Sequence, residues 1–177
     1  GLHTSVMVTG IGGPHVIART RSRSAEGNRL LMMGHLDTVH ESGGTLKTDA
    51  EHPGRLLGPG AADMKGGLVV IAGAVQALSD AGLLEGRALT VLLTADEEAG
   101  SPTARSLIEA EAREHHLCLV LECGTPMADG RTAIVTARSG MRRLTVDIAG
   151  VASHGGAARA AGVSAAHEMA HLICALE

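Results

Sequence analysis

The chain has 177 residues, of which 45% are hydrophobic, and this indicates a globular protein of one domain, or one domain and part of a second, rather than a disordered chain. A formal net charge of −4, spread along the sequence, argues against nucleic acid or an anionic membrane surface as a partner. The apolar run at 68–75 is interrupted by Gly73 and is far shorter than the roughly 18 residues of a membrane span, so we expect none.

The chain is unusual in having no aromatic residues and an odd number of cysteines. The chain contains no Phe, Tyr or Trp, so Leu, Val, Ile, Met and Ala must form the core. Its cysteines, Cys118, Cys123 and Cys174, are odd in number and scattered, which indicates reduced thiols rather than a disulfide framework. We therefore expect a cytoplasmic protein.

In chain order, short apolar segments that predict strands alternate with segments of helical spacing. Strands are expected at 15–21, 29–33, 55–57, 88–95 and 117–122, and helices at 64–81 and 101–114. Gly82 ends the first of these helices, whereas Ser101 is the expected N-cap of the second, with Pro102 at its first position. This alternation predicts an α/β fold with a mostly parallel sheet and helices on both faces.

The pattern changes near residues 138–140. The segment "MRRLTVDIAG" (141–150) alternates at period two, which predicts a half-exposed antiparallel strand, and 162–176 has helical character. We therefore expect one domain over 1–138 and the start of a second, α+β domain over 139–177.

Polar side chains with metal-binding potential follow four successive predicted strands. They are His35, Asp37, Asp63, Asp96, Glu97, Glu98 and Glu122. The carboxyl ends of strands in an α/β sheet meet at the edge where ligands bind. Carboxylates gathered there repel one another unless a cation offsets them, and His with carboxylates is a ligand set for zinc or a similar divalent ion.

Two pairs of these residues divide the chemistry between them. Glu97 and Glu98 are adjacent and point in different directions, so one can bind metal while the other acts as a general base. His35 and Asp37 are two apart on an extended segment and point to the same side, so the carboxylate can orient a ligating imidazole.

Other motifs are less consistent with chemistry. In "GPGAAD" an aspartate replaces the last glycine of a phosphate-binding loop, and neither a P-loop nor a G-x-S-x-G motif occurs. Lys65, beside Asp63, is interpreted as structural. "HEMAH" (167–171) matches the H-E-x-x-H zinc motif, but few residues follow it to supply a third ligand. We interpret it as part of a surface helix.

Four motifs in order, "GHLDTV", "GPGAADMKGG", "TADEEAGS" and "LEC", resemble those of the di-zinc exopeptidase and amidohydrolase family. That family includes glutamate carboxypeptidase, acetylornithine deacetylase, succinyl-diaminopimelate desuccinylase and aminoacylase, and the likeness is greatest to the glutamate carboxypeptidase branch. "VASHGGAARAAGVSAAHEMA" is similar to the opening of the family's lid and dimerisation domain. Family members begin before Gly1 and continue past Glu177, so the chain is expected to be a fragment that lacks one histidine ligand.

The resemblance implies a ligand set for two Zn²⁺ ions, with Co²⁺ or Mn²⁺ as alternatives. It implies that His35 and Glu122 bind one ion, Glu98 binds the other, and Asp63 bridges the two.

The resemblance also implies roles for residues that do not bind metal. Glu97 is the general base that activates the bridging water, and Asp37 orients the imidazole ligand. His154 helps to hold the scissile carbonyl across a homodimer interface formed by the lid domain.

The implied function is zinc-dependent hydrolysis of a peptide or N-acyl amino acid amide bond, with a small peptide or N-acyl amino acid as substrate. The alternative is a catalytically incompetent, truncated or remodelled chain that keeps the fold and part of the metal site. Zinc titration combined with an activity assay separates the two.

Overall fold

The computed structural model describes residues 2–8, 13–20, 29–40, 44–140 and 143–176. The chain forms two compact units, Gly1–Ile134 and Val135–Glu177, which are described separately below. The predicted boundary at 138–139 lies a few residues inside the second unit. The identities assigned to the two domains, catalytic and lid, stay predictions.

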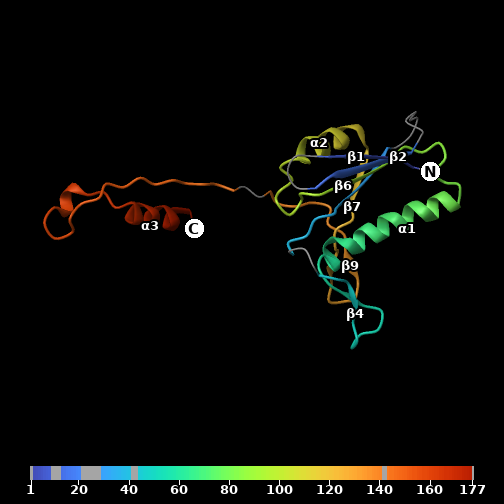
Figure 1. Ribbon diagram of the computed structural model, residues 1–177, viewed down its shortest axis with the longest axis horizontal. Coiled ribbons are helices and arrows are strands. Elements are labelled where there is room, and N and C mark those ends of the chain that lie inside the picture. Colours follow the sequence, from blue (N-terminus) through green and yellow to red (C-terminus); the bar gives the residue numbers. More distant parts are fainter. Residues whose placement is uncertain (1, 9–12, 21–28, 41–43, 141–142, 177) are drawn as a thin grey trace. The chain divides into compact units, whose positions relative to one another are not determined.

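The first unit is built on a five-stranded sheet with the order β1-β2-β6-β3-β7 (Figure 1). The strands are β1 (Leu2–Met7), β2 (His15–Thr20), β3 (Leu30–His35), β6 (Leu89–Thr94) and β7 (Leu117–Val120). Strands β6, β3 and β7 are mutually parallel, whereas β1 pairs with β2 and β2 pairs with β6 in antiparallel fashion. The α/β class is confirmed, and the sheet is mixed because β2 runs against the direction of the other four strands.

Two helices, α1 (Gly66–Asp80) and α2 (Arg105–Glu114), cover opposite faces of this sheet (Figure 1). Ala18, Val91 and Met32 lie in one row across three strands and pack on the α1 side, against partly buried residues that include Leu68 and Val75.

The α2 side of the sheet is made by the alternate residues of the same strands. Ile17, Leu31 and Leu92 are buried there, with Leu107 and Ile108 of α2 packed against them. Because successive side chains on a strand point to opposite faces, the apolar runs of the sequence fill both cores without any aromatic residue.

Helix α1 continues a π-helical turn, η1 (Ala61–Lys65), which itself bears Asp63. By length and composition alone, the helical segment Ala61–Asp80 would suffice to cross a membrane. Ile71 is buried against the sheet, as expected for a helix of a domain core, and the absence of a membrane partner stays a prediction.

Gly67 lets α1 pass close to the end of β7. A Cβ atom at this position would lie 1.8 Å from the carbonyl oxygen of Leu121. Gly73, two turns further along the same helix, would meet nothing within 4 Å. The close approach at Gly67 therefore requires glycine, whereas Gly73 has open space around it.

The predicted cap of the second helix is wrong. Helix α2 begins at Arg105 rather than at the residue after Ser101, and its first turn has no side-chain cap from Ala104. The Asp96 carboxylate instead accepts hydrogen bonds from the backbone N–H groups of Thr103 and Ala104, at 2.6 and 3.1 Å. A carboxylate at the end of β6 thus satisfies the free donors that precede the helix.

The remaining elements of the first unit are two short hairpins. Strand β4 (Lys47–Thr48) pairs with β5 (Leu56–Leu57), and β8 (Thr125–Pro126) pairs with β9 (Thr132–Ala133). The first hairpin lies within the segment 43–57, where a loop and a short strand were expected.

The second unit contains η2 (Arg159–Ala161) and α3 (Ala165–Leu176). The hydroxyl of Ser164 accepts a hydrogen bond from the backbone N–H of His167 and so caps α3. The strand predicted over 141–150 is wrong for residues 143–150, which are not in a strand, while 141–142 lie outside the described residues. Alternation alone does not make a strand, since within the described part of this unit the backbone pairing is a single bridge between Val151 and Val163.

Candidate metal centre

His35 is the last residue of β3 and the best buried member of the predicted site, with 2% of its surface exposed. Its Nδ1 lies 3.0 Å from the carbonyl oxygen of Asp37. Its Nε2 lies 3.0 Å from Asp63 Oδ1 and 3.5 Å from Glu122 Oε1. One imidazole from β3 therefore meets carboxylates from η1 and from the segment after β7.

The Asp37 carbonyl assigns the tautomer of the His35 ring. A carbonyl only accepts, so Nδ1 carries the proton and donates it, which leaves the lone pair of a neutral ring on Nε2. That lone pair faces the Asp63 carboxylate, which is also an acceptor. Two acceptors at this distance require a proton or a cation between them.

The pKa of His35 is raised from its ordinary value, although burial, the largest influence, lowers it. The hydrogen bond to the Asp37 carbonyl, the hydrogen bond to the Asp63 carboxylate, and the charges of Glu122 and Asp37 outweigh burial. The surroundings of the ring therefore favour positive charge at Nε2, as a proton or as a bound cation.

Glu98 joins this group from the turn that follows β6. One ligand atom from each of His35, Asp63 and Glu98 lies within 4.8 Å of the others. The backbone N–H of Glu98 donates to Asp37 Oδ2 at 2.9 Å. Asp37 thus contacts the imidazole through its carbonyl and fixes the Glu98 backbone through its carboxylate, in addition to the orienting role that we predicted for it.

The pKa of Glu122 is raised from its ordinary value by burial and by neighbouring carboxylates. Burial raises its pKa; His35 opposes this, while the charges of Asp63, Glu97 and Glu98 raise it further. The negative charges of three other carboxylates therefore act on Glu122, and a divalent cation would offset this repulsion.

Glu97 and His154 lie outside this cluster of ligand atoms. Glu97 is exposed on the same turn as Glu98, and its carbonyl accepts a hydrogen bond from Gly100 N at 2.7 Å. His154 belongs to the second unit, where its Nδ1 accepts hydrogen bonds from the N–H groups of Gly156 and Ala157. The catalytic roles of both residues stay predictions.

Lys65 and the "HEMAH" motif are not part of the cluster of candidate metal ligands. Lys65 Nζ donates to the carbonyl of Pro59 at 2.7 Å and so ties η1 to the loop before it, in line with a structural role. In "HEMAH" the rings of His167 and His171 stack edge to face at 4.5 Å on an exposed stretch of α3. Among the described residues, that pair is not part of a metal-type group of three ligands.

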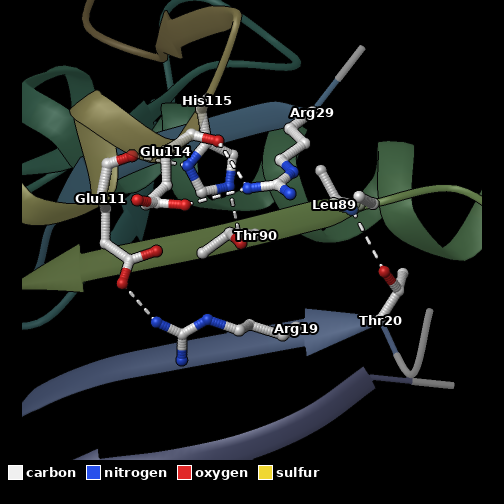
Figure 2. Close-up of a pocket in the computed structure, with 9 residues that line it drawn as sticks. Arg19, Thr20, Arg29, Leu89, Thr90, Glu111, Glu114 and His115 are labelled. Carbon is white, nitrogen blue, oxygen red and sulfur yellow. Dashed lines mark hydrogen bonds and ion pairs between the residues drawn. The ribbon is translucent and has the colours of Figure 1, made fainter. Parts of the chain in front are cut away.

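Two cavities lie near opposite ends of β6. One of about 460 Å³ opens beside Glu98, and its lining includes Asp37, Thr38, Ala99 and Pro102. The other, of about 220 Å³, lies at the start of β6 and is shown in Figure 2. Its arginines are neutralised, because Arg19 pairs with Glu111 and Arg29 pairs with Glu114.

The donor set fits a divalent metal. An imidazole nitrogen and carboxylate oxygens are the usual non-thiolate ligands of zinc, and they are presented here by rigid strand ends and by the turns that follow them. The buried ring is already oriented by a carbonyl, as ligating histidines usually are.

The fold and this cluster together define an α/β domain with a candidate metal centre at the carboxyl edge of its parallel strands. Residues 31–173 match the peptidase family M20/M25/M40, and the chain belongs to that family. The family resemblance seen in the sequence motifs is thereby confirmed.

Two curated relatives support this assignment, and one solved structure shares the fold. Carboxypeptidase G2 of Pseudomonas sp. (strain RS-16) is 36% identical over 162 residues, covering 91% of this chain and 38% of that protein. Succinyl-diaminopimelate desuccinylase of Methylobacterium sp. (strain 4-46) is 34% identical over 140 residues, covering 73% of this chain and 35% of that protein. The crystal structure of human carnosine dipeptidase 1 shares the fold, with a TM-score of 0.54 and 24% identity over 68% of this chain and 29% of that one.

The chain thus spans little more than a third of the length of these curated relatives. Every residue of this cluster was singled out from the sequence, and so was Asp96, but the Asp96 carboxylate instead accepts hydrogen bonds from the N–H groups of Thr103 and Ala104.

Proposed function

We propose that the intact protein is a zinc-dependent hydrolase of a peptide or N-acyl amino acid amide bond, of the carboxypeptidase or deacylase type. The observation that carries this proposal is the convergence of His35, Asp63 and Glu98 within 4.8 Å. The names of the two curated relatives, a carboxypeptidase and a desuccinylase, support the class of bond that is cleaved.

In this proposal four residues hold two zinc ions, with Co²⁺ or Mn²⁺ as alternatives. His35 and Glu122 would hold one ion and Glu98 the other, with the Asp63 carboxylate available to both. Bound zinc would supply Lewis-acid polarisation of the scissile carbonyl and a lowered pKa for water. The 3.0 Å approach of His35 Nε2 to Asp63 Oδ1 supports this pair as ligands of one ion.

Glu97 is the proposed general base. Its carboxylate takes a proton from the attacking water and then delivers it to the nitrogen of the leaving amine, which balances the hydrolysis. Its position beside Glu98 on an exposed turn next to the 460 Å³ cavity supports this role. Asp37 orients the His35 ring and holds the Glu98 backbone, so that the base and the ligand keep their separation.

The remaining parts of the proposal concern the whole protein. His154 hydrogen-bonds the scissile carbonyl across a homodimer that forms through the second unit, and the protein acts in the cytoplasm. The hydrogen bonds that His154 Nδ1 accepts leave Nε2–H as the outward donor, which suits this task.

Paired substitutions in the intact protein test the division of labour between the two glutamates. We expect Glu97→Gln to keep the metal content and the substrate affinity but to lower kcat by roughly 10²–10⁴-fold, because the general base is lost. Glu98→Gln should instead lower the metal content, measured by atomic absorption after dialysis. If Glu97→Gln kept full activity, the proposed mechanism would be wrong; if it lost metal while Glu98→Gln did not, the two roles would be exchanged.

A further inference from the structure

A buried chain of hydrogen bonds lies beneath the turn that carries Glu97 and Glu98. His15, at the start of β2, is 1% exposed, and Asp96, directly after β6, is 4% exposed. Thr103, from the turn before α2, lies between them: its Oγ1 is 3.0 Å from His15 Nε2 and 2.7 Å from Asp96 Oδ2. Three elements are therefore joined by polar side chains within the core.

All the hydrogen bonds of this network are donated in the same direction, from Ala95 through His15 and Thr103 to Asp96. The backbone N–H of Ala95 donates to His15 Nδ1 at 3.1 Å, so Nε2 carries the ring proton and donates to Thr103 Oγ1. The Thr103 hydroxyl then donates to the carboxylate of Asp96, which only accepts. Every link is satisfied in this arrangement, and reversing any link would bring two donors or two acceptors together.

Asp96 closes this turn through both its carboxylate and its backbone carbonyl. Asp96 Oδ2 accepts from the N–H groups of Thr103 and Ala104, and the Asp96 carbonyl accepts from Ser101 N at 2.8 Å. The residues between these contacts, 97–100, include Glu97 and Glu98 and are exposed. The turn thus has a base held by buried polar contacts and a tip that presents the two carboxylates.

We infer that His15, Thr103 and Asp96 are positioning residues for the metal centre and set the placement of Glu97 and Glu98. This inference rests on the proposed function of those two glutamates. Groups that orient metal ligands typically contribute about 10–100-fold to metal affinity, because a ligand held slightly out of place binds less tightly. Thr103 is the link to test, because its hydroxyl both accepts from His15 and donates to Asp96.

The test compares three variants of the intact protein. Thr103→Val removes the hydroxyl at nearly constant volume, whereas Thr103→Ser keeps it. Thr20→Val is the matched control, because Thr20 ends β2 whereas His15 begins it. The Thr20 hydroxyl accepts from Leu89 N at 3.1 Å (Figure 2) and donates to the Arg87 carbonyl at 2.6 Å. The readouts are the affinity for Co²⁺, the visible spectrum of the Co²⁺ protein, and the Tm without metal.

We expect Thr103→Val to lower Co²⁺ affinity by roughly 10–100-fold and to alter the visible spectrum, with Thr103→Ser close to wild type. Thr20→Val should lower Tm as Thr103→Val does but leave Co²⁺ affinity and spectrum unchanged. If Thr103→Val bound Co²⁺ as tightly as wild type with the same spectrum, or if Thr20→Val weakened binding equally, the positioning role would be overturned.

Two further outcomes are distinct. Should Thr103→Val fail to fold, His15→Asn takes its place, since it keeps an acceptor for Ala95 N–H and removes the donor to Thr103; unchanged Co²⁺ binding in that variant would contradict the inference. A wild-type protein that binds no Co²⁺ would overturn the proposed metal centre itself, which differs from the failure of the positioning role alone.

Discussion

The contact between Gly67 and β7 gives a prediction with a built-in control. An alanine Cβ at position 67 would lie 1.8 Å from the Leu121 carbonyl oxygen, whereas ordinary contacts of this kind are about 3.5 Å. The first turn of α1 or the end of β7 must therefore move by roughly 1.7 Å. Because the obstructing atom belongs to the backbone, we expect a cost near the upper end of the 1–3 kcal/mol typical of overpacking, about 3 kcal/mol.

The gain in helix propensity on replacing glycine by alanine, about 1 kcal/mol, offsets part of that cost. Gly67→Ala should thus lower the free energy of unfolding by about 2 kcal/mol, or Tm by roughly 4–8 °C. Gly73→Ala, in the same helix with open space around its Cβ, should instead raise the free energy of unfolding by about 0.5–1 kcal/mol. Urea unfolding of the two variants measures both values, and a Gly67→Ala variant as stable as Gly73→Ala would refute the steric argument.

Three further predictions concern single groups. Lys65→Met should lower the free energy of unfolding by roughly 1–2 kcal/mol in urea titrations, because a charged hydrogen bond to a carbonyl is lost; a loss of turnover at unchanged stability and metal content would contradict the structural role. Replacing His167 and His171 together by alanine should leave the metal content of the purified protein unchanged, and a loss of one equivalent by elemental analysis would show that "HEMAH" binds metal. Burial alone would raise the pKa of Asp96, but hydrogen bonds from the turn before α2 hold it below the ordinary 3.8, so its ionised form stabilises the fold above that pH and this contribution is lost as pH falls below it. Acid titration of wild type and Asp96→Asn should therefore show their difference in stability shrinking below about pH 3.8, and a constant difference would exclude the effect.

The central strands were predictable from their apolar composition, and the cluster was predictable from the rule that parallel strands end at one edge of the sheet. Continuous apolar runs such as 88–95 are buried on both faces of the sheet, so their strand character is visible in composition alone. His35 and Glu98 could be brought together from the sequence because β3 and β6 are parallel and end at the same edge. The edge strand β1 was not expected, since five of its six residues are exposed and it carries little hydrophobic signal.

Other features depend on contacts that the local sequence does not encode. Ser101 followed by Pro102 has the pattern of a helix cap, yet Asp96 reaches the free N–H groups, because the turn after β6 folds back over them. The contact of His35 Nδ1 with the carbonyl of Asp37, closer than its contact with that residue's carboxylate, likewise depends on how the backbone leaves β3. Residues 143–150 have the alternation of a strand but remain unpaired within the described part of their unit.

The pairing of β6 with β3 has a consequence for how the molecule folds. These neighbours are separated in sequence by the β4–β5 hairpin, η1 and the whole of α1, so their parallel register is reached only after a long loop has closed. Closing such a loop costs chain entropy before any contact compensates for it, and topologies dominated by distant pairs fold slowly. His35 is the last residue of β3, whereas Glu98 lies in the turn after β6, so the long loop separates them in the sequence. The candidate metal centre therefore has no local folding unit of its own, because its ligand-type residues come together only after β3 and β6 have paired.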